Sequence, residues 1–226
     1  NSRPLTIVFK QPLIIFDFDG TLADTTSTIL STYHATIAEL QADNRTDAEL
    51  RATIGFPLKE GFRHLYPEYN DAQLDLCVNT YRRIFNENKT RLVPQLFPGV
   101  VETLDKLANA GIVMTIASSR SRESLIEFCE ATGIAKYFSL ILGANDVVRS
   151  KPDPAPVLQT LAELRCKADE CIVVGDMPVD IAMGRGAGCH CVGVSYGNSS
   201  RSGLTAAGAD IVIDTMAELP PYCGEI

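Results

Sequence analysis

One segment near the start of the chain sets its architecture: Leu13-Ile14-Ile15-Phe16-Asp17-Phe18-Asp19-Gly20-Thr21-Leu22-Ala23-Asp24-Thr25. Its first four residues form an apolar run too short for a helix, and such a run is typical of a buried strand in a parallel sheet. Because side chains alternate along an extended chain, Asp17 and Asp19 leave the same face. Two neighbouring carboxylates indicate a bound cation, an acid/base role, or both. Gly20 permits a sharp turn with exposed amide N–H groups and Thr21 adds a hydroxyl, which predicts an anion site beside the cation site.

The composition excludes several classes of protein. A chain of 226 residues with 46% hydrophobic and 21% charged residues has ordinary globular composition, and it is long enough for one domain plus an insert or for two small domains. The net charge of −8 argues against nucleic acid or an anionic membrane as the main partner, because both require a basic surface. A phosphate ligand would therefore need cations supplied by its own site.

The cysteines and the apolar segments bear on the compartment. The seven cysteines contain no C-x-x-C pair, which favours reduced thiols of a cytosolic protein over disulfides or a zinc site. No segment approaches the apolar length of a membrane span. The sequence thus predicts a soluble, cytoplasmic protein, and it leaves both a monomer and a homodimer open.

A block of helical patterns follows the acidic segment. These patterns cover residues 26–40, 46–53, 58–66 and 71–89. No clear strand pattern interrupts them, which favours a separate helical unit. The block ends in a proline-containing stretch, residues 93–99, that is typical of a hinge or linker.

Strand and helix patterns alternate in the rest of the chain. Helices are expected at residues 100–110, 121–132, 154–164 and 179–187, and strands at 112–117, 138–142, 171–174, 191–194 and 211–213. This alternation predicts an α/β fold with a doubly wound, Rossmann-like parallel sheet and helices on both faces. Because the strand at 13–16 belongs to the same sheet, the helical block is an insertion at the carboxyl edge of that sheet. We therefore expect a core domain of residues 1–24 and 97–226, and an all-helical cap domain of residues 25–96 that acts as a lid.

Residues just after the strands are the candidate ligands, because open parallel sheets bind ligands outside the carboxyl ends of their strands. Ser118 and Ser119 follow one strand and lead into a helix, where they are either anion ligands or an ordinary N-cap. Arg120 and Arg122 are expected to be solvated rather than to act as ligands.

Two later segments add charged residues of both signs. Lys151 precedes a proline and a helix, and the proline favours an extended conformation, although a lone lysine is more often a surface residue. Asp176 follows a buried strand, and Asp180 comes about one helical turn later.

Together these segments resemble the four motifs of the haloacid dehalogenase superfamily, in its phosphatase branch with a small helical cap. Residues 17–25 are similar to the first motif, and the segments that contain Ser118, Lys151 and Asp176 are similar to the second, third and fourth, in the family's order. The fourth has the form G-D-x-x-x-D, with Met177 where many members place Ser or Thr. The resemblance covers nearly the whole chain, and the cap is its least specific part.

The resemblance implies a Mg²⁺-dependent phosphatase that works through an aspartyl phosphate. Asp17 would attack phosphorus, and Asp19 would protonate the leaving group and later activate water. The implied metal ligands are Asp17, Asp176 and the backbone carbonyl of Asp19, while Asp180 would hold a metal-bound water or orient Lys151. The implied phosphate ligands are Gly20, Thr21, Ser118, Ser119 and Lys151. Since Asp19 must start protonated, its pKa is expected to be raised by the crowded anionic site and by closure of the cap.

The cap is expected to select the substrate, because only the cap can touch the leaving group once the lid closes. Residues 53–59 resemble the cap loop of phosphoglycolate-phosphatase-like members, and a simple turn between helices is the alternative. Arg51, Gly55 and Lys59 are the candidate specificity residues, and either cation would suit a small acidic phosphate such as phosphoglycolate. Pyrophosphatase, nucleotide or sugar-phosphate phosphatase, β-phosphoglucomutase-like mutase and phosphonoacetaldehyde hydrolase, in which a lysine of this region forms an imine, stay open as alternatives.

A non-enzymatic phospho-acceptor or binding module is the alternative from another class. Receiver domains also combine an acceptor aspartate, an acid pair, Mg²⁺ and a Lys-Pro pair on a parallel sheet. They lack a helical insert, however, and are about half as long. The insert and the length therefore favour the enzyme.

Overall fold

The computed structural model describes residues 13–89 and 94–224, and the centre of this part of the chain is a six-stranded parallel sheet in the order β5-β4-β1-β6-β7-β8. The strands are β1 (Leu13–Phe16), β4 (Val113–Ala117), β5 (Phe138–Leu142), β6 (Cys171–Gly175), β7 (His190–Val194) and β8 (Ile211–Ile213). β1 lies in the middle, with Phe16 beside Ile116 of β4 and Val174 of β6. The predicted α/β class and the predicted parallel sheet are confirmed.

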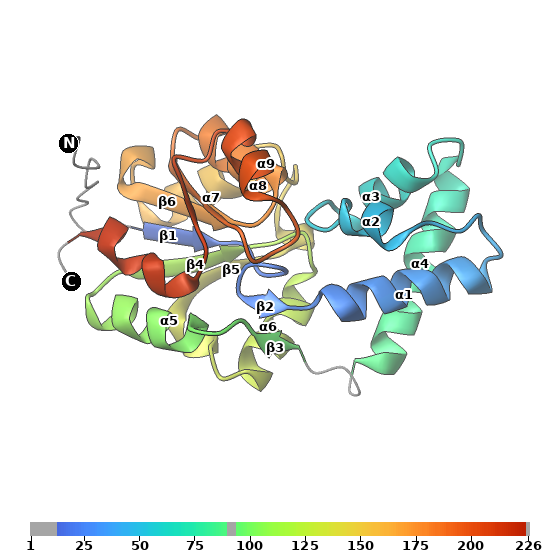
Figure 1. Ribbon diagram of the computed structural model, residues 1–226, viewed down its shortest axis with the longest axis horizontal. Coiled ribbons are helices and arrows are strands. Elements are labelled where there is room, and N and C mark those ends of the chain that lie inside the picture. Colours follow the sequence, from blue (N-terminus) through green and yellow to red (C-terminus); the bar gives the residue numbers. More distant parts are fainter. Residues whose placement is uncertain (1–12, 90–93, 225–226) are drawn as a thin grey trace.

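Helices cover both faces of the sheet (Figure 1). The helices are α5 (Val100–Asn109), α6 (Arg122–Ala131), α7 (Ala155–Leu164), α8 (Pro178–Gly186) and α9 (Arg201–Ala207). Ile14 and Phe16 of β1 pack with side chains of α5 and α6, whereas Leu13 and Ile15 pack with side chains of α7, α8 and α9. Because β1 is buried on both faces, its apolar run is continuous instead of alternating with polar residues.

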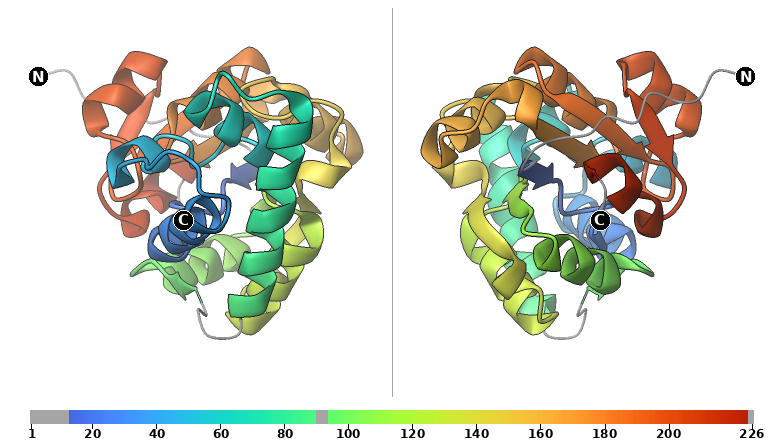
Figure 2. Two further views of the ribbon diagram at one scale, coloured as in Figure 1. Left: turned by 90° about the vertical axis from the view of Figure 1, so that its right-hand side faces the viewer. Right: turned by 90° about the vertical axis from the view of Figure 1, so that its left-hand side faces the viewer.

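Four helices form a second unit with its own hydrophobic core. They are α1 (Thr26–Glu39), α2 (Asp47–Arg51), α3 (Leu58–Leu65) and α4 (Asp71–Asn88). The six-stranded sheet and the helices that cover it, α5 to α9, form the other unit, called the sheet unit. In the left view of Figure 2 the long helix α4 stands in front of the sheet unit. Tyr33, Leu50 and Phe62 are buried in this core. A capping box of Thr46 and Glu49 opens α2, where it satisfies backbone N–H groups at the start of the helix. Hereafter these helices are called the helical unit.

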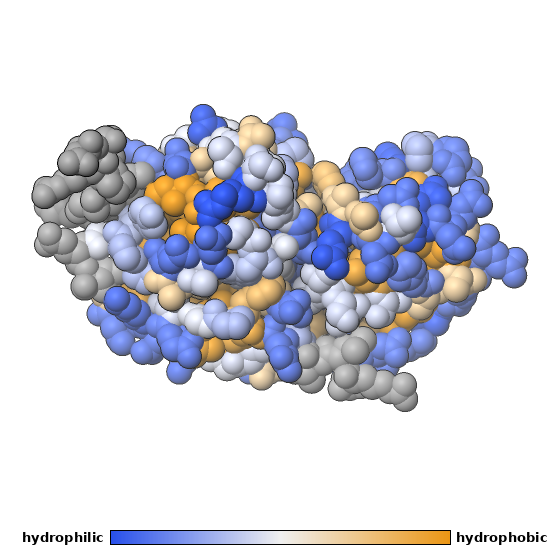
Figure 3. Space-filling model, in the orientation of Figure 1, coloured by the Kyte–Doolittle hydropathy of each residue, from blue (hydrophilic) through white to orange (hydrophobic). Residues whose placement is uncertain are grey.

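The two chain segments that join the units run side by side. β2 (Ala23–Asp24) leaves the sheet unit and pairs antiparallel with β3 (Gln95–Leu96), which returns to it. The backbone N–H of Phe97 extends this contact by donating to the carbonyl of Leu22 over 3.0 Å. Part of the linker expected at 93–99 is therefore a strand, and residue 93 lies outside the described residues. In the space-filling view of Figure 3 the molecule is narrower where the two units meet. Hydrophilic residues cover most of the helical unit on this face.

The elements missing from the sequence prediction are short. Helix α9 has only Leu204 fully buried, so it carries no apolar repeat. Short 3₁₀ helices occupy Ala135–Tyr137, Ala144–Asp146, Ala168–Glu170, Met216–Glu218 and Pro220–Cys223. All seven cysteines are free, as expected. Among the described helices none combines the length and the apolar character needed to cross a bilayer.

Candidate active site

Three buried carboxylates meet at the carboxyl end of the sheet. Asp17 follows β1, Asp176 follows β6 and Asp180 lies in the first turn of α8, with one oxygen of each within 4.8 Å of the others. Because β1 and β6 are neighbouring parallel strands in register, they end at the same level and bring Asp17 and Asp176 together. Burial raises the pKa of Asp17, and the charge of Asp180 raises it further. The same two causes raise the pKa of Asp176 to about 6.

This donor set fits a magnesium ion. Magnesium prefers carboxylate and carbonyl oxygens, and it neutralises acids that burial and mutual repulsion otherwise disfavour. All three carboxylates are at most 4% exposed. The carboxylate of Asp19 lies outside this group, so only its backbone carbonyl remains as the contribution expected from that residue.

Lys151 links two of the three acids. Its ammonium group lies 2.6 Å from Oδ1 of Asp17 and 2.6 Å from Oδ1 of Asp180, and the side chain is buried. Burial alone would lower the pKa of Lys151, but the two carboxylates outweigh it and the pKa is raised. The other oxygen of Asp180 accepts from the backbone N–H of Met177 at the start of α8. Lys151 is therefore a charged interior residue rather than a surface lysine.

Asp176 is held by residues from two loops. The backbone N–H and the side-chain amide of Asn198 donate to Oδ2 of Asp176 over 2.8 and 3.2 Å. The hydroxyl of Thr21 lies 3.2 Å from the other oxygen, Oδ1. Gly20 has a φ of +83°, and a Cβ atom there would come within 2.2 Å of Asp176. This position therefore requires glycine both for its conformation and for the close approach.

Asp19 forms a two-pronged ion pair with Arg120. The guanidinium donates from Nε to Oδ2 over 3.1 Å and from Nη2 to Oδ1 over 2.6 Å, and the hydroxyl of Thr25 also donates to Oδ1. Phe85 and Phe128 lie against the same guanidinium, with ring centroids 5.2 and 4.8 Å away. The prediction of a solvated Arg120 is wrong, because Asp19 and two aromatic rings compensate its burial. Arg122, by contrast, is half exposed.

This ion pair also reverses the pKa shift expected for Asp19. Burial raises the pKa of Asp19, but the charge and hydrogen bonds of Arg120 outweigh burial, and the pKa is lowered. In this arrangement Asp19 is ionised, contrary to the expectation of a protonated acid. The sequence prediction considered the neighbouring acids and closure of the cap but left out the charge of Arg120, because Arg120 had been placed in solvent.

The backbone amides of the first loop are not those that the sequence predicted for phosphate. The N–H of Gly20 donates to the carbonyl of Ala23, and the N–H of Thr21 donates to the carbonyl of Phe18. Both amides are engaged in closing the turn. The N–H groups of Phe18 and Asp19 have no acceptor among the described residues, so these two amides remain free to bind an anion.

The two serines after β4 have different surroundings. Ser118 is 8% exposed, and its hydroxyl oxygen accepts from the N–H of Arg120, which leaves the hydroxyl proton without an acceptor among the described residues. The hydroxyl of Ser119 instead donates to the carbonyl of Gly55 in the helical unit over 2.7 Å. Ser119 thus joins the two units here, whereas it had been expected to bind phosphate.

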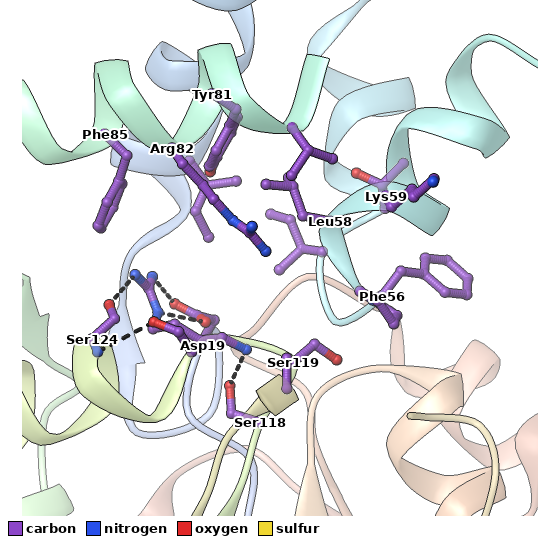
Figure 4. Close-up of a pocket in the computed structure, with 18 of the residues that line it drawn as sticks. Asp19, Phe56, Leu58, Lys59, Tyr81, Arg82, Phe85, Ser118, Ser119 and Ser124 are labelled. Atoms are coloured by element: carbon purple, nitrogen blue, oxygen red, sulfur yellow. Dashed lines mark hydrogen bonds and ion pairs between the residues drawn. The ribbon is translucent and has the colours of Figure 1, made fainter. Parts of the chain in front are cut away.

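A cavity of about 710 Å³ lies between the two units and reaches Asp17 and Asp19. Its wall on the helical side includes Lys59, Arg82 and the aromatic rings of Phe56, Tyr81 and Phe85 (Figure 4). Lys59 is within 2.8 Å of Asp75, and this hydrogen bond raises the pKa of the lysine.

The other two cap candidates are placed differently from Lys59. Arg51 is solvent-exposed and is not part of the cavity wall, so the geometry gives no support to its predicted role. Gly55 lines the cavity and has a φ of +99°. A Cβ atom at Gly55 would lie 3.3 Å from Val179 and 3.5 Å from Met177, so this loop of the helical unit packs closely on α8.

Sequence reasoning missed Arg120, Asn198 and Arg82. The signal for Asn198 was available, because its loop follows β7 and the rule of strand ends applies to it as it does to the other loops. No local signal distinguishes Arg120 from Arg122, or Arg82 from Arg83, because only the packing of distant elements gives the first of each pair its surroundings.

The chain is similar to proteins of known family. The model of the haloacid dehalogenase-like hydrolase family matches residues 14–194. "Probable phosphatase IndB" of Dickeya dadantii is 35% identical over 211 residues, which are 92% of each chain. "Pyrophosphatase PpaX" of Bacillus velezensis is 32% identical over 91% of this chain and 93% of its own. "Phosphoglycolate phosphatase" of Yersinia pseudotuberculosis is 32% identical over 93% and 92%. The crystal structure of a haloacid dehalogenase-like hydrolase from Bacteroides fragilis superposes with a TM-score of 0.87 at 29% identity, covering 93% of this chain and all of the other.

Proposed function

The chain belongs to the haloacid dehalogenase-like hydrolases, and on this premise we propose that it is a Mg²⁺-dependent phosphatase that hydrolyses small phosphate monoesters through an aspartyl phosphate on Asp17. One observation carries the proposal: Asp17 is buried beside Asp176 and Asp180 while Lys151 holds one of its oxygens. A surface acid would have neither the fixed orientation nor the charge compensation that a nucleophile needs.

Charge compensation is the first requirement, because a phosphate monoester and an attacking carboxylate repel each other. Asp17, Asp176 and the carbonyl of Asp19 are the proposed ligands of Mg²⁺, with Asp180 at the edge of the site, and the bound ion supplies charge neutralisation at the phosphoryl oxygens. The ammonium of Lys151 and the hydroxyl of Ser118 bind the same oxygens. The free N–H groups of Phe18 and Asp19 replace those of Gly20 and Thr21 in this role.

The reaction proceeds in two steps. The carboxylate of Asp17 attacks phosphorus, the bond to the leaving oxygen breaks, and Asp19 donates its proton to that oxygen. A water molecule then attacks the phosphorus of the aspartyl phosphate while Asp19 takes a proton from this water. The bond between phosphorus and the Asp17 oxygen breaks, which restores the carboxylate and releases phosphate. Because Arg120 occupies both oxygens of Asp19 in the described arrangement and keeps it ionised, Asp19 has to separate from Arg120 and take up a proton before it can donate one to the leaving oxygen.

Phosphoglycolate-like monoesters are the first candidate substrates. The relative named phosphoglycolate phosphatase and the small cap both support this choice. The relative named pyrophosphatase is equally similar, which makes pyrophosphate the second candidate. The hydrogen bond from Lys59 to Asp75 keeps the lysine charged, which is unfavourable for the imine of a phosphonate hydrolase.

The direct test measures phosphate release from p-nitrophenyl phosphate, phosphoglycolate and pyrophosphate with Mg²⁺ and with EDTA. We expect phosphate release in the presence of Mg²⁺ and none in EDTA. In Asp17→Asn, the turnover rate should fall at least ~10³-fold, because the variant keeps the shape of the side chain and lacks the nucleophile. Near-normal turnover by Asp17→Asn would refute the mechanism.

A further inference from the structure

Arg82 is a cation of the cavity wall that forms no ion pair with an acid of residues 13–89 or 94–224. It projects from α4 toward Asp19 and Ser119 in Figure 4, and it makes no hydrogen bond or ion pair with the described residues. Its side chain remains accessible to solvent, so a ligand in the cavity can reach it.

The other cations around this cavity are already engaged. Arg120 is held by Asp19, Lys59 by Asp75, and Lys151, at the base of the site, by Asp17 and Asp180. The charge of each of these cations is therefore already compensated by at least one carboxylate. Arg82 makes no such contact within the described part of the chain.

The neighbouring Arg83 shows what an arginine of α4 does when it faces away from the cavity. Arg83 forms ion pairs with Glu39 and Glu87 on the outer surface. Consecutive helical residues point about 100° apart, so one of the two arginines faces the sheet unit while the other faces the surface acids. Arg82 lies on the cavity face together with Val78 and Asn86, which are four residues away on either side.

Closure of the helical unit over a substrate would remove water from Arg82. A guanidinium that loses water without gaining an anion is strongly disfavoured, and its planar fork matches the geometry of a carboxylate or phosphate. Among the α4 residues of this wall, Val78, Tyr81 and Phe85 are apolar or aromatic, Asn86 is neutral, and the one acid, Asp75, is paired with Lys59. An anionic group of the ligand would therefore find its compensating charge at Arg82.

We propose that Arg82 is the residue of the helical unit that binds a second anionic group, a carboxylate or a phosphate, on the leaving-group side of the substrate. This inference rests on the proposed phosphatase function and narrows its substrates to phosphate esters or anhydrides with such a group. Arg82 thus takes the substrate-binding role that the sequence predicted for Arg51 or Lys59.

The kinetic test compares Arg82→Met with Arg83→Met as the matched control. For phosphoglycolate we expect kcat/KM to fall ~10- to 100-fold in Arg82→Met, since a charge-assisted hydrogen bond pair is lost. For p-nitrophenyl phosphate, which has no second anion, both variants should stay within about twofold of the wild type. Arg82→Lys should recover part of the loss, because it restores the charge without the planar fork. An equal loss on both substrates, or a loss on neither, overturns the inference.

A binding experiment separates this inference from the proposed function. Calorimetric titration with phosphonoacetate and with ethylphosphonate, in Mg²⁺, measures the contribution of the carboxylate without turnover. We expect the wild type and Arg83→Met to bind phosphonoacetate at least ~10-fold more tightly than ethylphosphonate. Arg82→Met should bind the two compounds with similar affinity. If the wild type releases no phosphate but shows this preference, the proposed function fails and the role of Arg82 stands. Absence of the preference in the wild type overturns the role of Arg82.

Discussion

Arg120 donates to both carboxylate oxygens of Asp19, over 3.1 and 2.6 Å, although the two residues lie 101 positions apart in the chain. The guanidinium also contacts Phe85 of the helical unit and Phe128 of the sheet unit. The pair thus connects the proposed proton donor to both units. A movement of α4 would change the packing of Phe85 on Arg120, and through it the surroundings of Asp19.

Arg120→Met should lower the free energy of unfolding at pH 7 by about 2–4 kcal/mol, because it leaves the buried carboxylate of Asp19 unpaired. The pKa of Asp19 is lowered by folding, so its contribution is present above the unfolded pKa of about 3.9 and is lost as the pH falls through the folded value. Urea unfolding at several pH values should therefore show that the difference in unfolding free energy between Arg120→Met and the wild type becomes smaller below about pH 4. In an Asp19→Asn background the destabilisation by Arg120→Met should not depend on pH. If the destabilisation is independent of pH in both backgrounds, the lowered pKa of Asp19 does not come from its pairing with Arg120.

Asp176→Asn should abolish stabilisation by Mg²⁺. An ion that binds only the folded state raises its stability by about 2.7 kcal/mol at a hundred times its dissociation constant. In EDTA the variant should be at least as stable as the wild type, because it removes one of three crowded carboxylates. Melting temperatures with Mg²⁺ and with EDTA measure both effects. If Mg²⁺ raises the melting temperature of Asp176→Asn as much as that of the wild type, the ion binds elsewhere.

Gly20→Ala should unfold the site, whereas Gly133→Ala should be mild. Both glycines have positive φ, +83° and +75°, so both variants pay a backbone cost of about 1–2 kcal/mol. Only at Gly20 would the new Cβ atom overlap Asp176, at 2.2 Å, while nothing lies within 4 Å at Gly133. The difference between the two unfolding free energies isolates this overlap, and similar values for the two variants mean that the loop relaxes freely.

Ser118→Ala and Ser119→Ala should lower activity for different reasons, the first through phosphate binding and the second through the contact between the two units. The Ser118 hydroxyl has a free proton beside the site, so its loss should lower kcat/KM about 10-fold or more for every phosphate ester. The Ser119 hydroxyl donates to Gly55, so its loss should weaken contact between the units by about 1 kcal/mol and act on all substrates through cap closure. Hydrogen exchange of the loop around Gly55 is the distinguishing measurement, since only Ser119→Ala should accelerate it.

The thiols should react slowly in the native state. Burial raises the pKa of Cys129 and Cys191 to about 12, and with the latter the nearby Asp210 adds to the shift. Cys166 is the one cysteine of the seven that is not buried. Titration with Ellman's reagent should show one fast thiol in the native protein, absent from Cys166→Ser, and seven thiols in denaturant. Several fast thiols in the native protein contradict the burial described.

Features that depend on short stretches of chain were predictable from the sequence. The strand at 13–16, the helices of the insert and the order of strand-end acids are local patterns, because hydrophobic periodicity, capping boxes and glycine turns act within a few residues. For this reason the α/β class was predictable, and so were Asp17 and Asp176 as neighbours at one sheet edge, whereas Lys151 was expected there only from the resemblance to the family's third motif.

Charge pairing across the chain was decided by the tertiary structure alone. Arg120 meets Asp19, Lys59 meets Asp75, and Arg82 is left facing the cavity, although as isolated residues these cations are alike. The pKa of a carboxylate depends on the distance to its partner and on the water removed around both, and neither quantity is written in the spacing of residues along the chain. The sequence by itself determined which chemical groups gather at the sheet edge, whereas the packing of the two units determined which of their charges are engaged.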